Sequence, residues 1–186
     1  AVFARVRAAG GQVVSCIYDL IPQLWRGASV GRVPEIHLAW LETALVESDG
    51  MIAISRTVAE ELCAFVAAHA LPTRPGLRIG WFHYGSDIAP VRDGEAKAAV
   101  REAFASSAPT FLLVATVEPR KGHAIALAAF EHLWNAGVDA RLVLIGRRGW
   151  HVETIIAAME RHPERGRRLF WFENADDVDL AFAYDH

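Results

Sequence analysis

The sequence predicts an α/β protein with two domains, each built on a parallel β-sheet. Short apolar, β-branched runs alternate with amphipathic segments along the 186 residues. The runs are apolar throughout, which is typical of strands buried on both faces of a parallel sheet. This alternation occurs twice, and we place the boundary between the two halves at Ser106-Ser107-Ala108-Pro109.

In the first half, apolar runs predict strands at 12–18, 50–54 and 77–82. A helix is expected at 35–48, and another begins at Ser55 or Thr57, where Thr57 and Glu60 fit a capping box. The residues expected to face the core are Ile36, Trp40, Ala44 and Leu45 in the first helix and Leu62, Phe65 and Val66 in the second.

A connector at 88–94 and a predicted helix at 95–105 precede the boundary, and after it we expect strands at 110–115, 141–145 and 168–172. Helices are expected at 122–136, ended by a left-handed Gly137, and from Asp176, a predicted N-cap. The apolar positions expected to face the core are Leu127, Phe130 and Trp134, followed by Val152, Ile155, Ile156 and Met159 at helical spacing.

Parallel strands joined by helices define Rossmann-like domains, whose ligands gather at the carboxyl ends of the strands. We assign residues 1–90 to the first domain, 91–109 to a linker and 110–186 to the second domain. The chain begins with Ala1 and ends inside a predicted helix, so we expect an internal fragment in which both domains are incomplete.

The composition excludes several classes of protein. The chain is 53% hydrophobic and 22% charged, with a net charge of -3, which disfavours disorder and nucleic-acid binding. No apolar run reaches the roughly 18 residues that a membrane span needs. Cys16 and Cys63 lie in apolar stretches and are predicted to be buried free thiols, which suits a reducing, cytoplasmic location.

The segment Ala115-Thr116-Val117-Glu118-Pro119-Arg120-Lys121-Gly122-His123 joins a predicted strand to a predicted helix. Free backbone amides and the positive end of a helix dipole suit an anion there, and two cations precede the helix. Lysine occurs only twice in the chain, at Lys97 and Lys121. The residues alone leave two interpretations open, a diphosphate site or a solvated pair of basic side chains.

Five segments occur in a fixed order: Tyr18-Asp19-Leu20-Ile21-Pro22, Ile52-Ala53-Ile54-Ser55, Glu118-Pro119-Arg120-Lys121-Gly122-His123, 142–150 (LVLIGRRGW) and 177–184. Together they resemble the family-4 retaining glycosyltransferases of the GT-B fold. The nearest similarity is to the mannosyltransferase-like branch that builds O-antigen and other surface polysaccharides. The resemblance covers nearly the whole chain.

The resemblance implies that Lys121 contacts the diphosphate of a nucleotide-sugar donor, with Arg120 beside it. Many relatives have a Gly-Arg pair just upstream, where this chain has Ala115-Thr116. The resemblance also implies that Gly146 lies near the nucleoside. The remaining donor-side positions that it implies are Thr116, Glu118 and Gly122 in the loop, and Phe172 and Glu173 near the base. Gly146 could equally serve a tight turn, and Phe172 could be a packed aromatic.

On the acceptor side, Asp19 follows a strand and could orient an acceptor hydroxyl or cap its own loop. Relatives often have His before this acidic residue, where this chain has Tyr18. Ser55 is expected to cap the helix that follows it, and a role as a site residue is the second interpretation. The family's carboxylate-rich motif would follow residue 186, so we expect the fragment alone to be inactive.

Other motifs give weaker signals. Asp177-Val178-Asp179 matches a metal-binding DxD pattern but lies at a predicted helix start, where acidic residues are favoured in any case. The histidines form no HxH or HExxH pattern, and only His123 adjoins the candidate loop. GxGxxG, P-loop and Gly-x-Ser-x-Gly signatures are absent. The basic run 161–168 fits a solvated helix end better than a membrane-surface patch.

The resemblance therefore implies a metal-independent retaining hexosyltransferase that uses a nucleotide-sugar donor, with GDP-mannose suggested by the branch. It needs no cofactor, and its acceptor is expected to be a glycan or a lipid-linked glycan at the inner membrane face. Two alternatives are a non-catalytic GT-B module that binds a partner and a nucleotide-sugar epimerase of the same fold.

Overall fold

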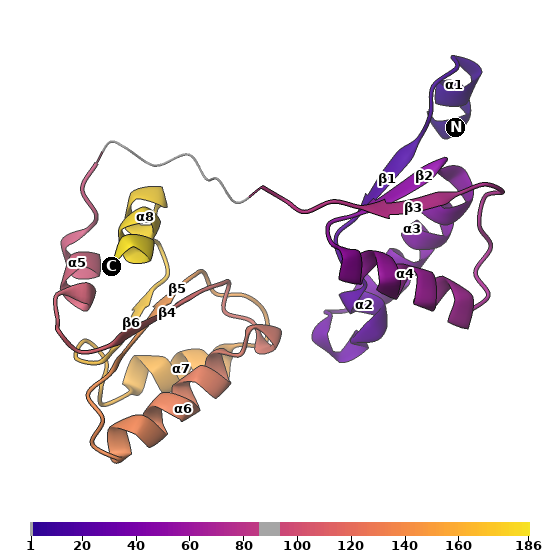
Figure 1. Cartoon of the computed structure of the whole chain (residues 1–186). Helices are drawn as coiled ribbons and strands as arrows, with labels where there is room; N and C mark the ends of the chain where they lie inside the picture. The colour runs from indigo at the N-terminus through magenta and orange to yellow at the C-terminus, as the bar shows by residue number, and fades with distance from the viewer. Residues whose placement is uncertain (1, 86–93) are drawn as a thin grey trace. The chain divides into compact units, whose positions relative to one another are not determined.

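The computed structural model describes residues 2–85 and 94–186. The chain divides into two compact units, Ala1–Ile88 and Ala89–His186, and each contains one three-stranded parallel sheet (Figure 1). Helices connect the strands in both units. The predicted α/β class with two Rossmann-like parallel sheets is therefore confirmed.

The first unit has strand order β1-β2-β3. Its strands are β1 (Val14–Ile17), β2 (Gly50–Ala53) and β3 (Arg78–Trp81), all parallel. The crossover helices are α3 (Val33–Glu47) and α4 (Arg56–Ala68). Two short helices that the sequence did not predict are α1 (Val2–Ala8) and α2 (Ile21–Leu24), the latter followed by a 3₁₀ turn, Arg26–Ala28.

The core of the first unit joins α3 and α4 to the strands. In α4, Leu62 and Phe65 are buried as predicted, with Val66 packed beside them. In α3 the predicted face is partly wrong, because Ile36 is 65% exposed and Trp40 is 41% exposed. The helix instead buries Pro34, Leu41, Ala44 and Leu45. Periodicity located the helix, and the position of the sheet decided which stripe it buries.

Three local predictions in this unit are decided by the structure. Ser55 caps α4, because its hydroxyl accepts a hydrogen bond from the amide of Val58 at 3.2 Å. The capping box of Thr57 and Glu60 does not form, since Glu60 pairs with Arg56 at 2.8 Å. The predicted burial of the two cysteines is wrong, because both are free but exposed.

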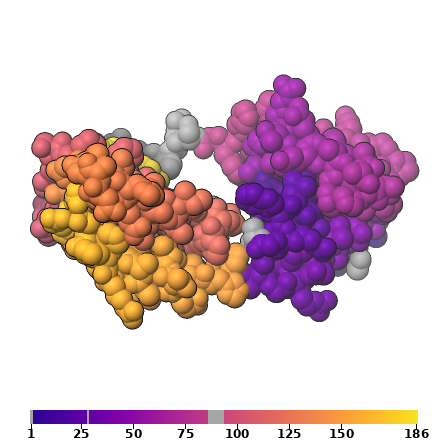
Figure 2. Space-filling view, turned by 90° about the horizontal axis from the view of Figure 1, so that it is seen from below, coloured from indigo at the N-terminus to yellow at the C-terminus, as the bar shows by residue number. Residues whose placement is uncertain are grey.

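The second unit has strand order β4-β5-β6. Its strands are β4 (Thr110–Val114), β5 (Arg141–Ile145) and β6 (Leu169–Phe172). Its helices are α5 (Ala98–Phe104), α6 (His123–Asn135), α7 (Glu153–Arg161) and α8 (Asp177–Asp185). Helices α6 and α7 lie side by side, and Figure 2 shows both at the surface of this unit.

Both faces of the second sheet are covered, which explains its uniformly apolar strands. Leu142 and Leu144 of β5 join one cluster with α6 and α7, whereas Val143 and Ile145 join another with α5 and α8. The predicted core positions of α6 and α7 are buried or packed against the first cluster. Helix α6 ends before Gly137, whose φ of 78° is the predicted left-handed conformation. Helix α5, within the predicted 91–109 linker, packs in this unit.

A buried carboxylate fixes the start of α8. Asp176 and Asp179 form a capping box, and Asp179 is fully buried. The Asp179 carboxylate accepts hydrogen bonds from the Lys97 amide at 2.8 Å, the Lys97 ammonium at 2.5 Å and the Asp176 amide at 3.1 Å. Burial alone would raise the pKa of Asp179, but these hydrogen bonds outweigh it and lower the pKa below its usual range. The carboxylate thus ties the start of α5 to α8.

Replacing this carboxylate should destabilise the second unit. We expect Asp179→Ala to lower the free energy of unfolding by about 3 kcal/mol, because buried amides lose their acceptor. Asp177→Ala is the matched control, since Asp177 lies in the same turn but is exposed, and should cost less than about 1 kcal/mol. Urea denaturation followed by circular dichroism measures both, and equal losses would contradict the assignment.

Candidate functional site

The most distinctive loop of the second unit connects β4 to α6. After Val114 the chain runs through residues 115–118 into a 3₁₀ turn, Pro119–Lys121, and Gly122 then caps α6 with a φ of 76°. No side chain caps this helix, so its first backbone amides are free to bind a ligand. A Cβ placed on Gly122 would meet no atom within 4 Å, so there is open space at the helix start.

Backbone hydrogen bonds hold this loop against the segment that follows β5. The amide of Ala115 donates to Ile145 at 3.0 Å, and the amide of Val117 donates to Arg147 at 2.8 Å. In return, the amide of Gly149 donates to Val117 at 2.9 Å. The parallel pairing of β4 and β5 therefore continues beyond the strands, and backbone hydrogen bonds hold the two loops together.

Two glycines make this contact possible. A Cβ on Gly146 would lie 1.9 Å from the carbonyl oxygen of Ala115. A Cβ on Gly149 would lie 2.5 Å from the carbonyl oxygen of Val117. Side chains at these positions would collide with backbone that cannot rotate away. The sequence analysis identified Gly146 as a site residue but not Gly149. The visible sign of Gly149 was its position three residues after Gly146.

The charged side chains of the loop differ in how they are paired. Arg120 lies 2.9 Å from the half-buried carboxylate of Glu118, so much of its charge is neutralised. Lys121 is exposed, and it takes part in no ion pair in the described part of the chain. Thr116 is also exposed. Of the two adjacent cations predicted from the sequence, Lys121 is thus the one left free for an anionic ligand.

Glu173, predicted near the nucleotide base, is bound by an arginine. Arg148 lies 3.1 Å from Glu173 and 2.8 Å from Glu160, and its guanidinium stacks 5.1 Å from the ring centre of Trp171. Glu173 and then Glu160 raise the pKa of Arg148 above its usual value. The sequence analysis did not single out Arg148, although two consecutive arginines directly after a strand and a glycine were a visible signal.

His123 lies beneath the loop and is only 1% exposed. Neither ring nitrogen makes a hydrogen bond of normal geometry to a described residue. Burial lowers the pKa of His123, and the nearby backbone of Ala115 and Glu118 opposes this only in part. The ring is therefore neutral at pH 7. It lines a mostly apolar pocket of about 270 Å³ together with Glu118, Pro119, Ala124 and residues at the start of α7.

The structure brings eight of the nine predicted site residues to the carboxyl edge of the second sheet. They are Thr116, Glu118, Arg120, Lys121, Gly122, Gly146, Phe172 and Glu173. Phe172 accepts a hydrogen bond from the Gly146 amide at 3.1 Å, and its ring packs in the cluster that includes α8. That contact favours the packed-aromatic interpretation of its side chain.

The ninth residue, Asp19, belongs to the first unit and follows β1. Its Oδ1 atom accepts a hydrogen bond from the amide of Ile21 at 2.9 Å, so it does cap its own loop. His37 lies nearby, and burial lowers its pKa while the charge of Asp19 partly opposes the shift. Tyr18, next to Asp19, contacts Tyr84 with ring centres 5.9 Å apart.

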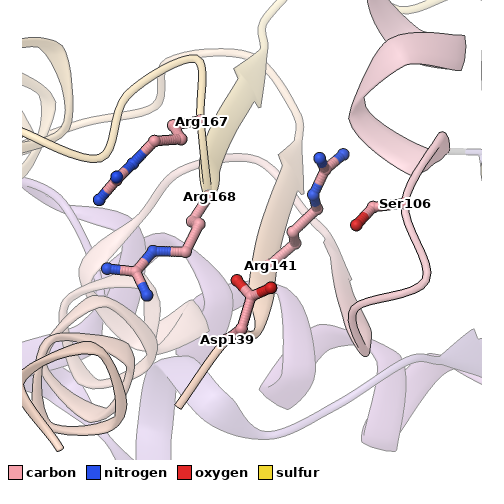
Figure 3. Close-up of a pocket in the computed structure, with 5 residues that line it drawn as sticks. All are labelled: Ser106, Asp139, Arg141, Arg167 and Arg168. Atoms are coloured by element: carbon pink, nitrogen blue, oxygen red, sulfur yellow. The ribbon is translucent and has the colours of Figure 1, made fainter. Parts of the chain in front are cut away.

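A second group of arginines lies at the opposite edge of the second sheet. Ser106, Asp139, Arg141, Arg167 and Arg168 line a pocket of about 300 Å³ (Figure 3). The guanidinium of Arg141 points to one side and those of Arg167 and Arg168 to the other (Figure 3). Each already has partners, since Arg141 donates to Ala103 at 2.8 Å and the other two bind Glu164.

The ionic cluster at this edge stabilises the unit and does not form a free anion site. Arg168 and then Arg167 lower the pKa of Glu164 to about 2. Within the segment 161–168, which was predicted to be a solvated helix end, Arg161, Arg165 and Arg167 are exposed, and Arg167 and Arg168 pair with Glu164. The cluster lies at the amino ends of the strands, away from the edge where such folds bind ligands.

The described residues contain neither a candidate metal site nor a helix that could span a membrane. No group of three or more His, Cys, Asp or Glu side chains within 2–85 and 94–186 could hold a metal ion. No helix in these same ranges is both long and apolar enough to cross a membrane. Of the predicted DxD pair, Asp179 is buried and fully hydrogen-bonded.

The second unit thus has a Rossmann-like parallel sheet with an exposed lysine, unpaired among the described residues, at the start of α6. No protein-family model matches the chain. Three proteins of Escherichia coli, each described as the serotype-specific mannosyltransferase WbdA, are 34%, 34% and 33% identical to it over 184 residues. The matches cover 96% of this chain, which spans only 23%, 22% and 23% of these relatives. The similarity supports the glycosyltransferase class that the motifs predict.

The close approach at Gly146 can be tested directly. Gly146→Ala should lower the free energy of unfolding by about 2 to 4 kcal/mol, because its methyl group collides with the Ala115 carbonyl. Gly80→Ala is the control, since a Cβ on this strand glycine meets nothing within 4 Å, and should cost less than about 1 kcal/mol. Thermal unfolding measures both, and a neutral Gly146→Ala would show that the loops can separate freely.

Proposed function

We propose that this chain is part of a retaining glycosyltransferase of the GT-B fold and of family 4. It transfers a hexose, with mannose favoured, from a nucleoside-diphosphate sugar to a glycan or lipid-linked acceptor in polysaccharide biosynthesis. The proposal draws on the names of the similar proteins and on the ordered motifs. Because the chain spans less than a quarter of those relatives, the activity is proposed for the whole protein.

The observation that carries the proposal is that the Lys121 side chain is available to bind an anion. It is exposed and not ion-paired in the described part of the chain, and it directly precedes the uncapped start of α6. Free amides, the helix dipole and an ammonium group together suit a diphosphate. The structural partners that neutralise Arg120 and Arg148 leave this charge available.

In the proposed reaction, the bond between C1 of the sugar and the diphosphate oxygen breaks. Negative charge grows on that oxygen, and Lys121 and the first amides of α6 stabilise it. The acceptor hydroxyl attacks C1 from the same face, forms the new glycosidic bond and releases its proton to the departing diphosphate. Configuration at C1 is retained because the bond forms on the side that the leaving group vacates.

The other predicted residues have supporting roles in this proposal. Thr116, Glu118 and Gly122 shape the loop around the phosphates, and Gly146 and Glu173 approach the nucleoside. On the acceptor side, Asp19 uses Oδ1 to cap its loop, which leaves Oδ2 to orient an acceptor hydroxyl. His37, kept neutral by burial, lies beside it.

Removing the Lys121 ammonium should slow turnover. We expect Lys121→Ala in the full-length protein to lower kcat/KM by about a hundredfold, equivalent to about 2.7 kcal/mol of lost transition-state stabilisation. Arg167→Ala is the control, because it removes an exposed cation at the opposite edge of the sheet. Initial rates of mannose transfer from GDP-mannose measure both, and equal rates for the two variants would refute the proposal.

The proposed chemistry uses protein charges where other transferases use a metal ion. We therefore expect the full-length protein to retain most of its activity after dialysis against EDTA, measured as sugar transfer from the same donor. A loss of activity that added Mg²⁺ or Mn²⁺ restores would instead show that a cation carries the leaving-group charge.

A further inference from the structure

We propose that His123 is a positioning residue, which holds the turn that carries Lys121 in the geometry that binds the donor. The inference rests on the proposed function, because it names the residue that supports the lysine and adds no contact with the donor itself. His123 is the first residue of α6, and its side chain lies beneath the loop. It is the only fully buried histidine among the described residues, and the proposed reaction gives it no role.

The ring of His123 faces the backbone of the loop at two places. Burial lowers the pKa of His123, and the backbone of Ala115 and Glu118 partly opposes this shift. A backbone group raises the pKa of a histidine when its carbonyl oxygen faces a ring N–H, because this contact favours the protonated form. Neither contact has normal hydrogen-bond geometry, so both are electrostatic contacts of the ring with a carbonyl group.

The two carbonyl groups that the ring meets fix the path of the loop. The Glu118 carbonyl accepts the hydrogen bond of the Lys121 amide at 3.0 Å, which closes the 3₁₀ turn. The Ala115 carbonyl oxygen occupies the space beside Gly146, 1.9 Å from where a Cβ of this glycine would lie. His123 therefore contacts the loop where it turns toward Lys121 and where it crosses the segment after β5.

The surroundings of His123 favour a supporting role over ligand binding. The ring is neutral at pH 7 and only 1% exposed, so it adds no positive charge to the site. The pocket that it lines is mostly apolar and includes Val152 and Ile155. An apolar side chain would suit such a place better than an imidazole, because burying polar N–H groups costs free energy. The carbonyl groups of the loop explain why a polar ring is found there.

The test compares variants of the full-length protein that keep or remove the N–H groups of His123. GDP and UDP are titrated in parallel by isothermal titration calorimetry. His123→Phe fills the space without an N–H donor and should weaken binding of the preferred nucleotide by about tenfold. His123→Asn and His123→Gln place an amide N–H near the positions of Nδ1 and Nε2, and at least one should recover most of the lost affinity. If both bind as weakly as His123→Phe, the inference is overturned.

A double variant separates positioning from packing. If His123 acts through Lys121, adding His123→Phe to Lys121→Ala should weaken binding little further, whereas additive losses would overturn the inference. His132→Phe is the control, because His132 lies on the same helix but is exposed, and it should bind like the parent protein.

The same titrations distinguish failure of this inference from failure of the proposed function. If Lys121→Ala weakens binding but His123→Phe binds like the parent protein, the role of His123 is refuted and the diphosphate site stands. If Lys121→Ala also binds like the parent protein, both proposals fail. Circular dichroism checks folding, and His123→Leu, a smaller apolar replacement, takes the place of His123→Phe if the latter unfolds.

Discussion

The contact between the loops after β4 and β5 is the constraint on which the candidate site depends. Two glycines let the backbone of one loop reach the carbonyl groups of the other, where any side chain would collide. Hydrogen bonds from Val117 and Gly149 then extend the sheet beyond its strands. A loop fixed in this way holds the turn at Pro119–Lys121 and the first amides of α6 in place before a ligand arrives. Preorganised donors of this kind contribute most when charge develops during a reaction.

At this edge of the sheet, the ion pairs decide which basic side chains keep an available charge. Carboxylates neutralise Arg120 and Arg148, and burial keeps His123 neutral beneath the loop. Lys121 remains without an ion-pair partner among the described residues. The paired arginines stiffen the loops, whereas the Lys121 ammonium can meet an anion without first breaking an existing ion pair. Ion pairs and the candidate ligand site thus lie within a few residues of each other.

The other edge of the second unit shows the opposite arrangement. There Arg141, Arg167 and Arg168 line a pocket, but backbone carbonyls and Glu164 already bind their guanidinium groups. Asp179 similarly uses its buried carboxylate to join α5 to α8. A cluster of charged residues in the sequence is therefore a poor guide to function until the partners of each charge are known. The same clusters explain how a unit with only three strands holds its peripheral helices.

The sequence by itself determined the α/β alternation, the six strands and the main helices, because these follow from local periodicity, caps and glycines such as Gly137. It also located the loop at 115–123. Only the tertiary structure decided which stripe of α3 is buried, that Cys16 and Cys63 are exposed, and which of the neighbouring cations are free. Periodicity describes a segment alone, whereas burial and ion pairing depend on residues such as Glu160 and Glu173 that approach from other parts of the chain.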